Sequence, residues 1–262
     1  MPIVKDIRYL KNSDHQKHTL DVYIPEAEGT FPVLVFIHGG SWYEGSKDIY
    51  LQLGEHMAEK GVVAVLINYR LGGEANYLDM SSDCSAAIEW VADAIDWYKG
   101  EKDNIFLSGH SAGGHLAALI TLNKKFLGEA FIAQHLKGCI LIDAFGLNMD
   151  YVMVNNTAFF ARELRKVFTD VPTNWKDASP VHFIDSTPVP FLIMVGSETY
   201  PYLTFDNALF ITQLDKHDIA NTHYTLRGKN HRDMVTRMKN KNDEAYDRLL
   251  EFIHSNTVRK SY

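Results

Sequence analysis

The sequence predicts an α/β protein in which a mostly parallel central sheet is covered by helices on both faces. Short apolar runs of strand length alternate along the chain with longer segments of helical periodicity, as in βαβ units. Several of these runs are continuously apolar, which is expected of strands that are buried on both faces. The chain has 262 residues, 46% of them hydrophobic and 23% charged. This is enough for a single domain with a substantial core over residues 1–262.

The predicted strands differ in how deeply they should be buried. Residues 18–24 (HTLDVYI) alternate between polar and apolar side chains and end at Pro25, as an edge strand would. Residues 33–37 (VLVFI) and 62–67 (VVAVLI) are continuously apolar and should lie inside the sheet. The remaining predicted strands are 105–107, 139–142, 191–195 and 222–226.

Helices are predicted between these strands, with one stretch that does not fit. The helical segments are 48–60, 79–98, 112–122, 204–218 and 243–254. Residues 145–187 form a long stretch without a clear strand. An insertion of this length in an α/β fold is often a small lid or a pocket wall. An irregular excursion that only covers the core is the alternative.

Composition and charge argue against several classes of partner and cofactor. The net charge is −7 and there is no long basic run, so we expect no nucleic-acid partner. No apolar run approaches the roughly 18 residues that cross a bilayer, and the N-terminus lacks a secretory signal pattern. We therefore expect a cytoplasmic protein without a membrane partner. No His or Cys spacing suits a metal, and Cys84 and Cys139 are predicted to be buried free thiols. The oligomeric state is not indicated.

The strongest local signal is Gly109-His110-Ser111-Ala112-Gly113, which matches the pattern G-x-S-x-G. The pattern alone is weak, but here it follows a buried strand and directly precedes a predicted helix, where a nucleophile elbow must lie. Such a turn is so tight that the residues two places before and after the serine need to lack side chains. Ser111 is therefore predicted to be a catalytic nucleophile.

A second signal is the run His38-Gly39-Gly40-Ser41-Trp42, at the end of the predicted strand VLVFI. Acyl transfer needs backbone N–H groups aimed at the oxygen that gains charge in the tetrahedral intermediate. Consecutive glycines at the carboxyl end of a strand let the chain turn so that such groups face the site. His38 comes too early in the chain to be the base, and its expected role is to hold this loop by hydrogen bonds.

The sequences HGGSW and GHSAGGHLA resemble the hormone-sensitive-lipase-related and arylformamidase-like branch of the α/β-hydrolases, to which small carboxylesterases and kynurenine formamidases belong. Similar stretches are LDVYIP, GSKD, INYRL at 67–71 and ASPVHF at 178–183, so the resemblance runs over roughly 18–231. It implies the α/β-hydrolase fold. It also implies that the backbone N–H groups of Gly40 and Ser41 form the oxyanion hole, with that of Ala112 as the third donor.

The catalytic base should be a histidine that follows the last strand. His231 stands a few residues past the predicted strand THYTL and before the final helix. His217 and His223 fall inside a predicted helix and strand, and His254 lies near the end of the last helix. His231 is therefore the predicted base.

The acid of the triad is less clear. It should follow the predicted strand FLIMV, where many members of the family have an aspartate three residues past the glycine. Thr199 occupies that position here, and the nearest carboxylate is Glu198, one place earlier. We predict Glu198 as the acid, since glutamate is an accepted third member of such triads. Asp143, after the predicted strand CILI, and Asp206, inside a predicted helix, are the alternatives.

These residues predict an enzyme that works through an acyl intermediate. His231 would take the proton of Ser111, whose oxygen attacks the substrate carbonyl, and water would then release the acyl group. No metal or organic cofactor is needed. The leading hypothesis is a carboxylesterase for small, soluble esters with short acyl groups. The alternatives are an arylformamidase that cleaves N-formylkynurenine or a similar formamide, and a catalytically inactive hydrolase fold that binds a ligand.

Overall fold

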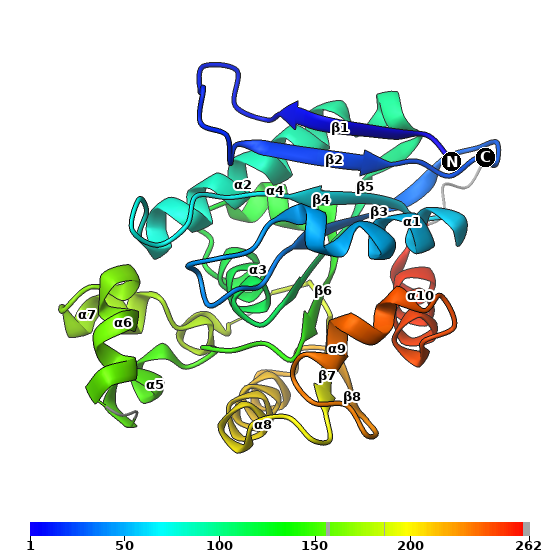
Figure 1. Ribbon diagram of the computed structural model, residues 1–262. Coiled ribbons are helices and arrows are strands. Elements are labelled where there is room, and N and C mark those ends of the chain that lie inside the picture. The colour runs from blue at the N-terminus through cyan, green and yellow to red at the C-terminus, as the bar shows by residue number, and fades with distance from the viewer. Residues whose placement is uncertain (156–157, 186, 259–262) are drawn as a thin grey trace.

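The computed structural model of the protein describes residues 1–155, 158–185 and 187–258, with side chains except at 158–161. Eight strands form one sheet in the order β1-β2-β4-β3-β5-β6-β7-β8 (Figure 1). The strands are β1 (Ile3–Arg8), β2 (Thr19–Tyr23), β3 (Phe31–Ile37), β4 (Val63–Ile67), β5 (Gly100–His110), β6 (Leu136–Ile142), β7 (Phe191–Gly196) and β8 (Asn221–Leu226). β3 to β8 are parallel, whereas β2 runs antiparallel to both of its neighbours. The predicted mostly parallel sheet is confirmed.

The strand β1 is the one that the sequence analysis missed. Its sequence, IVKDIR, carries three charged residues and has no continuous apolar run. It pairs only with β2, at the edge of the sheet, and its register shifts between Val4 and Ile7. Asp6 has a φ of 54° at this irregularity. A strand with one neighbour and mostly exposed side chains leaves little hydrophobic pattern in the sequence.

The predicted helices are present as α1 (Leu51–Glu59), α2 (Tyr77–Ala94), α3 (Ala112–Leu122), α8 (Pro201–Lys216) and α10 (Glu244–Asn256). Their ends differ from the prediction where capping decides them. α2 begins at Tyr77 because Asn76 and Asp79 form a capping box. Three short elements were not predicted from the sequence: α4 (Glu129–His135), α9 (Asp233–Thr236) and the 3-10 turn η4 (Arg237–Lys239).

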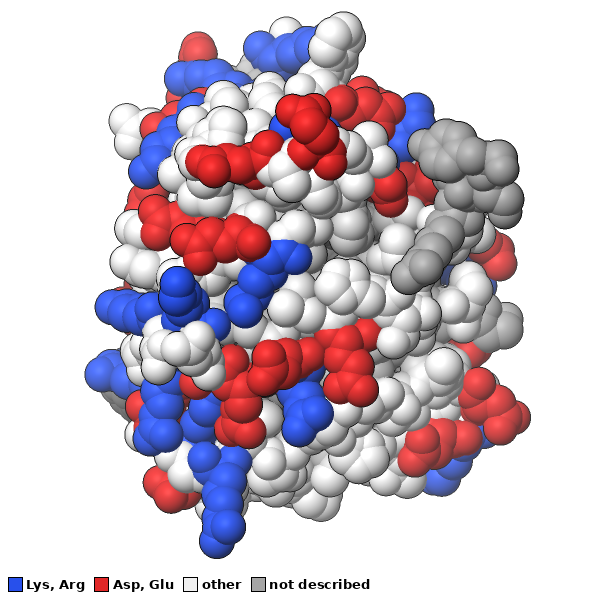
Figure 2. Space-filling view, turned by 90° about the vertical axis from the view of Figure 1, so that its right-hand side faces the viewer, with Lys and Arg blue, Asp and Glu red and all other residues white. Residues whose placement is uncertain are grey.

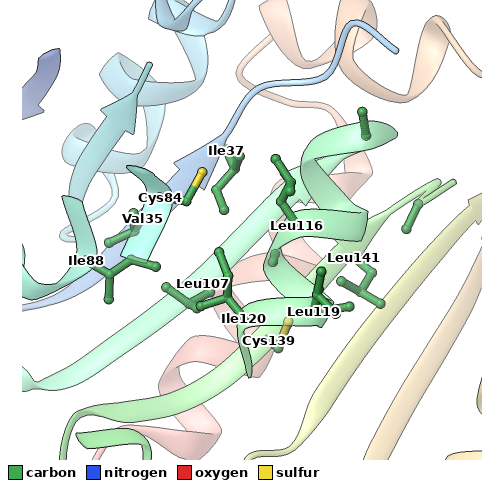
Figure 3. Packing of buried hydrophobic residues seen from close by; sticks show 14 of the residues in the cluster. Val35, Ile37, Cys84, Ile88, Leu107, Leu116, Leu119, Ile120, Cys139 and Leu141 are labelled. Carbon is green, nitrogen blue, oxygen red and sulfur yellow. The ribbon is translucent and has the colours of Figure 1, made fainter. Parts of the chain in front are cut away.

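The central strands alternate between two buried clusters, one on each face of the sheet. Val35 and Ile37 face the cluster that contains α2 and α3, whereas Leu34 and Phe36 face the one that contains α1 and α10. Figure 3 shows the first cluster: Val35, Ile37, Leu107 and Leu141 of the strands pack against Cys84 and Ile88 of α2 and against Leu116, Leu119 and Ile120 of α3. Cys84 and Cys139 are buried and free, as predicted.

The insertion at 145–187 is helical rather than irregular. It holds α5 (Met149–Asn155), α6 (Ala158–Phe168), α7 (Pro172–Asp177) and the 3-10 turn η3 (Pro180–Phe183), and positions 156, 157 and 186 lie outside the described residues. The helices gather at one end of the sheet (Figure 1). Tyr43 Oη donates a hydrogen bond to the carbonyl of Glu163 at 2.7 Å, and Trp42 packs edge-on against Phe168. The insertion is thus a wall against the glycine loop that follows β3.

The surface shows no concentration of one sign of charge on the face in Figure 2. Acidic and basic side chains are interspersed there, with acidic residues in short bands. Among the described helices, none combines the length and the apolar character that a membrane span requires.

Candidate active site

Ser111 lies in a strained turn between β5 and α3. Its φ is 55° and its ψ is −120°, a region that residues with side chains rarely adopt. The turn is so tight that a Cβ at Gly109 would lie 2.2 Å from the carbonyl carbon of Gly113, and one at Gly113 would lie 2.1 Å from the carbonyl oxygen of Ile37. Both glycines are therefore required by packing. This is the geometry expected of a nucleophile elbow, which presents the serine at the carboxyl end of the sheet.

His231 lies in the loop between β8 and α9 and contacts Ser111. Its Nε2 is 2.9 Å from Ser111 Oγ. Its Nδ1 is 2.6 Å from Asp143 Oδ2. The imidazole thus lies between the hydroxyl and a carboxylate, in the order that a serine, a base and an acid require.

The carboxylate that meets His231 belongs to Asp143, so the prediction of Glu198 was wrong. Asp143 directly follows β6 and is fully buried. The Gly196 N–H donates to its Oδ1 at 3.1 Å, and the Thr199 hydroxyl donates to its Oδ2. Glu198 is exposed in the turn after β7, where its backbone N–H donates to the carbonyl of Lys229. This turn directs Thr199, and not Glu198, towards Asp143.

Asp206, the other alternative, has a different function in the structure. It is buried in α8, and its carboxylate accepts hydrogen bonds from the backbone N–H groups of Gly146, Leu147 and Asn148 at 2.9–3.1 Å. Burial raises its pKa to about 6, against the effect of these donors. Asp206 therefore fastens the start of the insertion to α8 and does not contact His231.

The sequence placed Asp143 near the site but did not decide between it and Glu198. Asp143 is the first residue after the strand CILI, and in the sheet that strand is the direct neighbour of β5. The chain at Asp143 takes a φ of 47°. Such a positive φ in a residue with a side chain is uncommon and clusters at functional sites.

The glycine loop after β3 lies against Ser111. Gly40 has a φ of 126°, and a Cβ there would lie 2.0 Å from the carbonyl oxygen of Glu44, so only glycine fits. The Gly39 N–H donates to Tyr50 Oη at 3.1 Å. Within the described part of the chain, the N–H groups of Gly40, Ser41 and Ala112 have no acceptor. These groups are the predicted oxyanion donors.

His38 holds this loop, as predicted. Its Nδ1 donates to the carbonyl of Gly39 at 2.8 Å, and its ring stacks on Tyr69 with centroids 4.4 Å apart. Tyr69 Oη in turn donates to the carbonyl of His38. Burial lowers the pKa of His38 to about 4, so the ring is neutral. Its Nε2 has no hydrogen-bond partner among the described residues, so His38 is not hydrogen-bonded to Ser111.

Aromatic side chains line the approach to His231. The ring of Tyr200 lies 5.8 Å from that of His231, and Tyr202 stacks on Tyr200 at 5.5 Å. Tyr202 also contacts Phe145 edge-on. Tyr200 is 54% exposed and Tyr202 42%. An exposed aromatic surface of this kind offers apolar contact to a substrate.

Comparison with known sequences places the chain in a family. Residues 20–201 match the sequence model of the BD-FAE family. The chain belongs to the BD-FAE family. It is 27% identical to a probable isoprenylcysteine alpha-carbonyl methylesterase of Arabidopsis thaliana, over 92% of this chain and 61% of the relative. It is 30% identical to esterase LipQ of Mycobacterium tuberculosis, over 64% of this chain and 42% of the relative. This chain thus spans about three-fifths of the length of the Arabidopsis relative.

Solved structures confirm the α/β-hydrolase fold. Esterase B of Lactobacillus rhamnosis superposes with a TM-score of 0.81 at 18% identity, over 97% of this chain and 84% of the other. A truncated carbohydrate esterase from gut microbiota superposes with a TM-score of 0.83 at 20% identity, over 98% and 96% of the two chains. The family match confirms the resemblance of HGGSW and GHSAGG to the hormone-sensitive-lipase-related branch of the α/β-hydrolases.

Proposed function

We propose that this chain is a serine hydrolase that cleaves small carboxylic esters through an acyl-enzyme on Ser111. The observation that carries the proposal is the hydrogen-bonded series Ser111 Oγ–His231 Nε2 and His231 Nδ1–Asp143 Oδ2, at 2.9 and 2.6 Å. The related proteins cited above are named as esterases, which supports an ester as the substrate.

The geometry supports a specific division of roles. Asp143 fixes the imidazole with Nε2 unprotonated, so that His231 can take the proton of Ser111 as Oγ attacks the carbonyl carbon. The oxygen that becomes negative would be held by the N–H groups of Gly40, Ser41 and Ala112. His231 then returns the proton to the leaving alcohol, and a water repeats the sequence on the acyl-enzyme.

The wall beside the glycine loop consists of large, buried aromatic side chains. Trp42 and Phe168 are fully buried and packed edge-on, and Phe145 packs against Trp42 as well. Close packing of this kind supports a short acyl group in the proposed substrate. The exposed rings of Tyr200 and Tyr202 lie on the side of His231.

Covalent labelling with a fluorophosphonate tests the proposal, with the Ser111→Ala variant as the control. We expect the unaltered protein to be labelled once and the variant not at all. A chain that only binds a ligand would remain unlabelled in both forms. Hydrolysis of an ester series of increasing acyl length, measured beside N-formylkynurenine, then decides the substrate. Faster cleavage of the formamide than of any ester would replace our proposal with an arylformamidase.

We also propose a cytoplasmic location and a single domain for this protein. A cytoplasmic location can be checked by fractionating cells that express the tagged full-length protein. A single domain over residues 1–262 can be checked by limited proteolysis, which should leave one fragment of nearly full length.

A further inference from the structure

Tyr50 and His110 are buried beside the site but have no part in the mechanism above. Tyr50 ends the 3-10 turn η1 (Lys47–Tyr50), and His110 is the last residue of β5, directly before Ser111. Each is 7% exposed. The ring of His110 lies 4.6 Å from that of His231, and its Nδ1 lies 3.0 Å from where a Cβ on Gly39 would be. His110 therefore lies between the two loops that carry the chemistry.

Three hydrogen bonds connect these loops through the two side chains. The Gly39 N–H donates to Tyr50 Oη at 3.1 Å. Tyr50 Oη is 3.4 Å from His110 Nδ1, the longest of the three contacts. His110 Nε2 is 3.1 Å from the carbonyl oxygen of His231. The series begins in the loop after β3 and ends in the loop after β8.

The chemistry of the partners fixes the direction of every bond. A carbonyl oxygen only accepts, so His110 must carry its proton on Nε2. In a neutral imidazole Nδ1 is then an acceptor, and it can be satisfied by the Tyr50 hydroxyl. That hydroxyl oxygen keeps a lone pair for the Gly39 N–H. The opposite tautomer would place a lone pair of Nε2 against the carbonyl of His231 and leave the Tyr50 proton without an acceptor.

Both side chains are held in the neutral forms that this series needs. Burial, together with the smaller effect of the neighbouring His231, lowers the pKa of His110 to about 3. Burial raises the pKa of Tyr50 to about 12. A neutral His110 also avoids repulsion when His231 becomes an imidazolium in the reaction, because the two rings are in contact.

We infer that Tyr50 and His110 are positioning residues that hold the oxyanion loop and the loop of the catalytic base at a fixed separation. This inference rests on the proposed function. The loops need such a link because β3 and β8 are separated in the sheet by β5, β6 and β7, so no strand pairing connects them. Displacements of about 1 Å in a catalytic arrangement can cost on the order of 10²-fold in rate.

Removal of either link should slow the reaction without weakening substrate binding. Tyr50→Phe and His110→Met each interrupt the series, and we expect kcat to fall by about 10- to 10²-fold with KM changed less than about twofold. The double variant should be no slower than the slower single one, since one interruption already breaks the link. His110→Gln, whose amide nitrogen can reach the place of Nε2, should retain most of the rate.

The matched control is Tyr246→Phe. Tyr246 is also buried, and its hydroxyl donates to the carbonyl of Met238 at 2.7 Å, but it contacts none of the site residues. Tyr246→Phe should lower the melting temperature about as much as Tyr50→Phe and leave kcat unchanged. Equal kcat values for the two variants, or multiplicative losses in the double variant, would overturn the inference.

Nitrogen-15 NMR of the histidine rings gives a test that needs no variant and no substrate. We expect His110 to show a protonated Nε2 and an unprotonated Nδ1 from about pH 5 to pH 9, while an ordinary histidine titrates in this range. A protonated Nδ1 would refute the series of bonds. If the unaltered protein neither hydrolyses esters nor reacts with a fluorophosphonate, the proposed function fails, and NMR still decides whether the link exists.

Discussion

Replacement of Asp143 by Asn tests whether Asp143 or Glu198 is the acid of the triad. The change keeps the size of a side chain that is fully buried but removes the negative charge 2.6 Å from His231 Nδ1. The amide can present its NH₂ to Nδ1, which leaves the imidazole protonated on Nε2 and unable to accept the proton of Ser111. Loss of this orientation costs about 10³- to 10⁴-fold in kcat, or roughly 4–5.5 kcal/mol of transition-state stabilisation.

The assay is kcat and KM for a short-chain ester, with Glu198→Gln as the comparison. Because Glu198 is exposed and the imidazole is hydrogen-bonded to Asp143 instead, its replacement removes no contact made in the transition state and should change kcat by no more than about twofold. KM should change little for either variant. A larger loss for Glu198→Gln than for Asp143→Asn, with both proteins shown to be folded by thermal melting, would refute the assignment made from the geometry.

Three further predictions concern the same region. Ser111→Ala and His231→Ala should each lower kcat by at least about 10³-fold, and the double variant should be little worse; more than about a tenth of the activity left in either would contradict their roles. Ser41→Pro should lower kcat by at least roughly 10²-fold, because it deletes one N–H and because proline cannot adopt the φ of 50° found at Ser41. Ser41→Ala keeps the N–H and should be nearly silent; equal effects in folded proteins would place the donor elsewhere. Burial lowers the folded-state pKa values of His38 and His115 from 6.5 to about 4. Between pH 4 and pH 6.5 these two histidines are therefore protonated in the unfolded chain but not in the folded protein. The free energy of unfolding, measured with urea, should therefore fall as the pH is lowered from 6.5 towards 4, less steeply in His115→Gln; a pH-independent value would contradict the buried neutral rings.

Ser111 and His231 could be predicted from the sequence because their positions depend on local pattern and chain order. Ser111 needs a strand, two glycines and a helix in succession, and all of them are visible as residue types. His231 was identified by elimination: His223 lies in β8 and His254 in α10, and His217 directly follows α8.

The acid could not be predicted in the same way. Both candidate turns, after β6 and after β7, end near the site, and the choice depends on which side chain each turn directs inward. Asp143 points to His231 because its backbone adopts a φ of 47°, and the turn after β7 places Thr199 inward and Glu198 outward. Such backbone angles are decided by tertiary packing and leave little trace in residue order. The helices of the insertion escaped prediction because they are short segments whose stability depends on tertiary packing. α6, for example, packs against Trp42 and Tyr43.

The placement of the acid after β6 has a consequence for how this scaffold could change its specificity. The turn after β7 carries no member of the triad. Its Thr199 hydroxyl only donates a hydrogen bond to Asp143. Glu198 and Tyr200 in that turn are exposed and lie beside His231. A library of variants at these two positions could therefore reshape the entrance for the substrate while the proton transfer stays intact. In a hydrolase whose acid stands on that turn, the same substitutions would alter recognition and catalysis together.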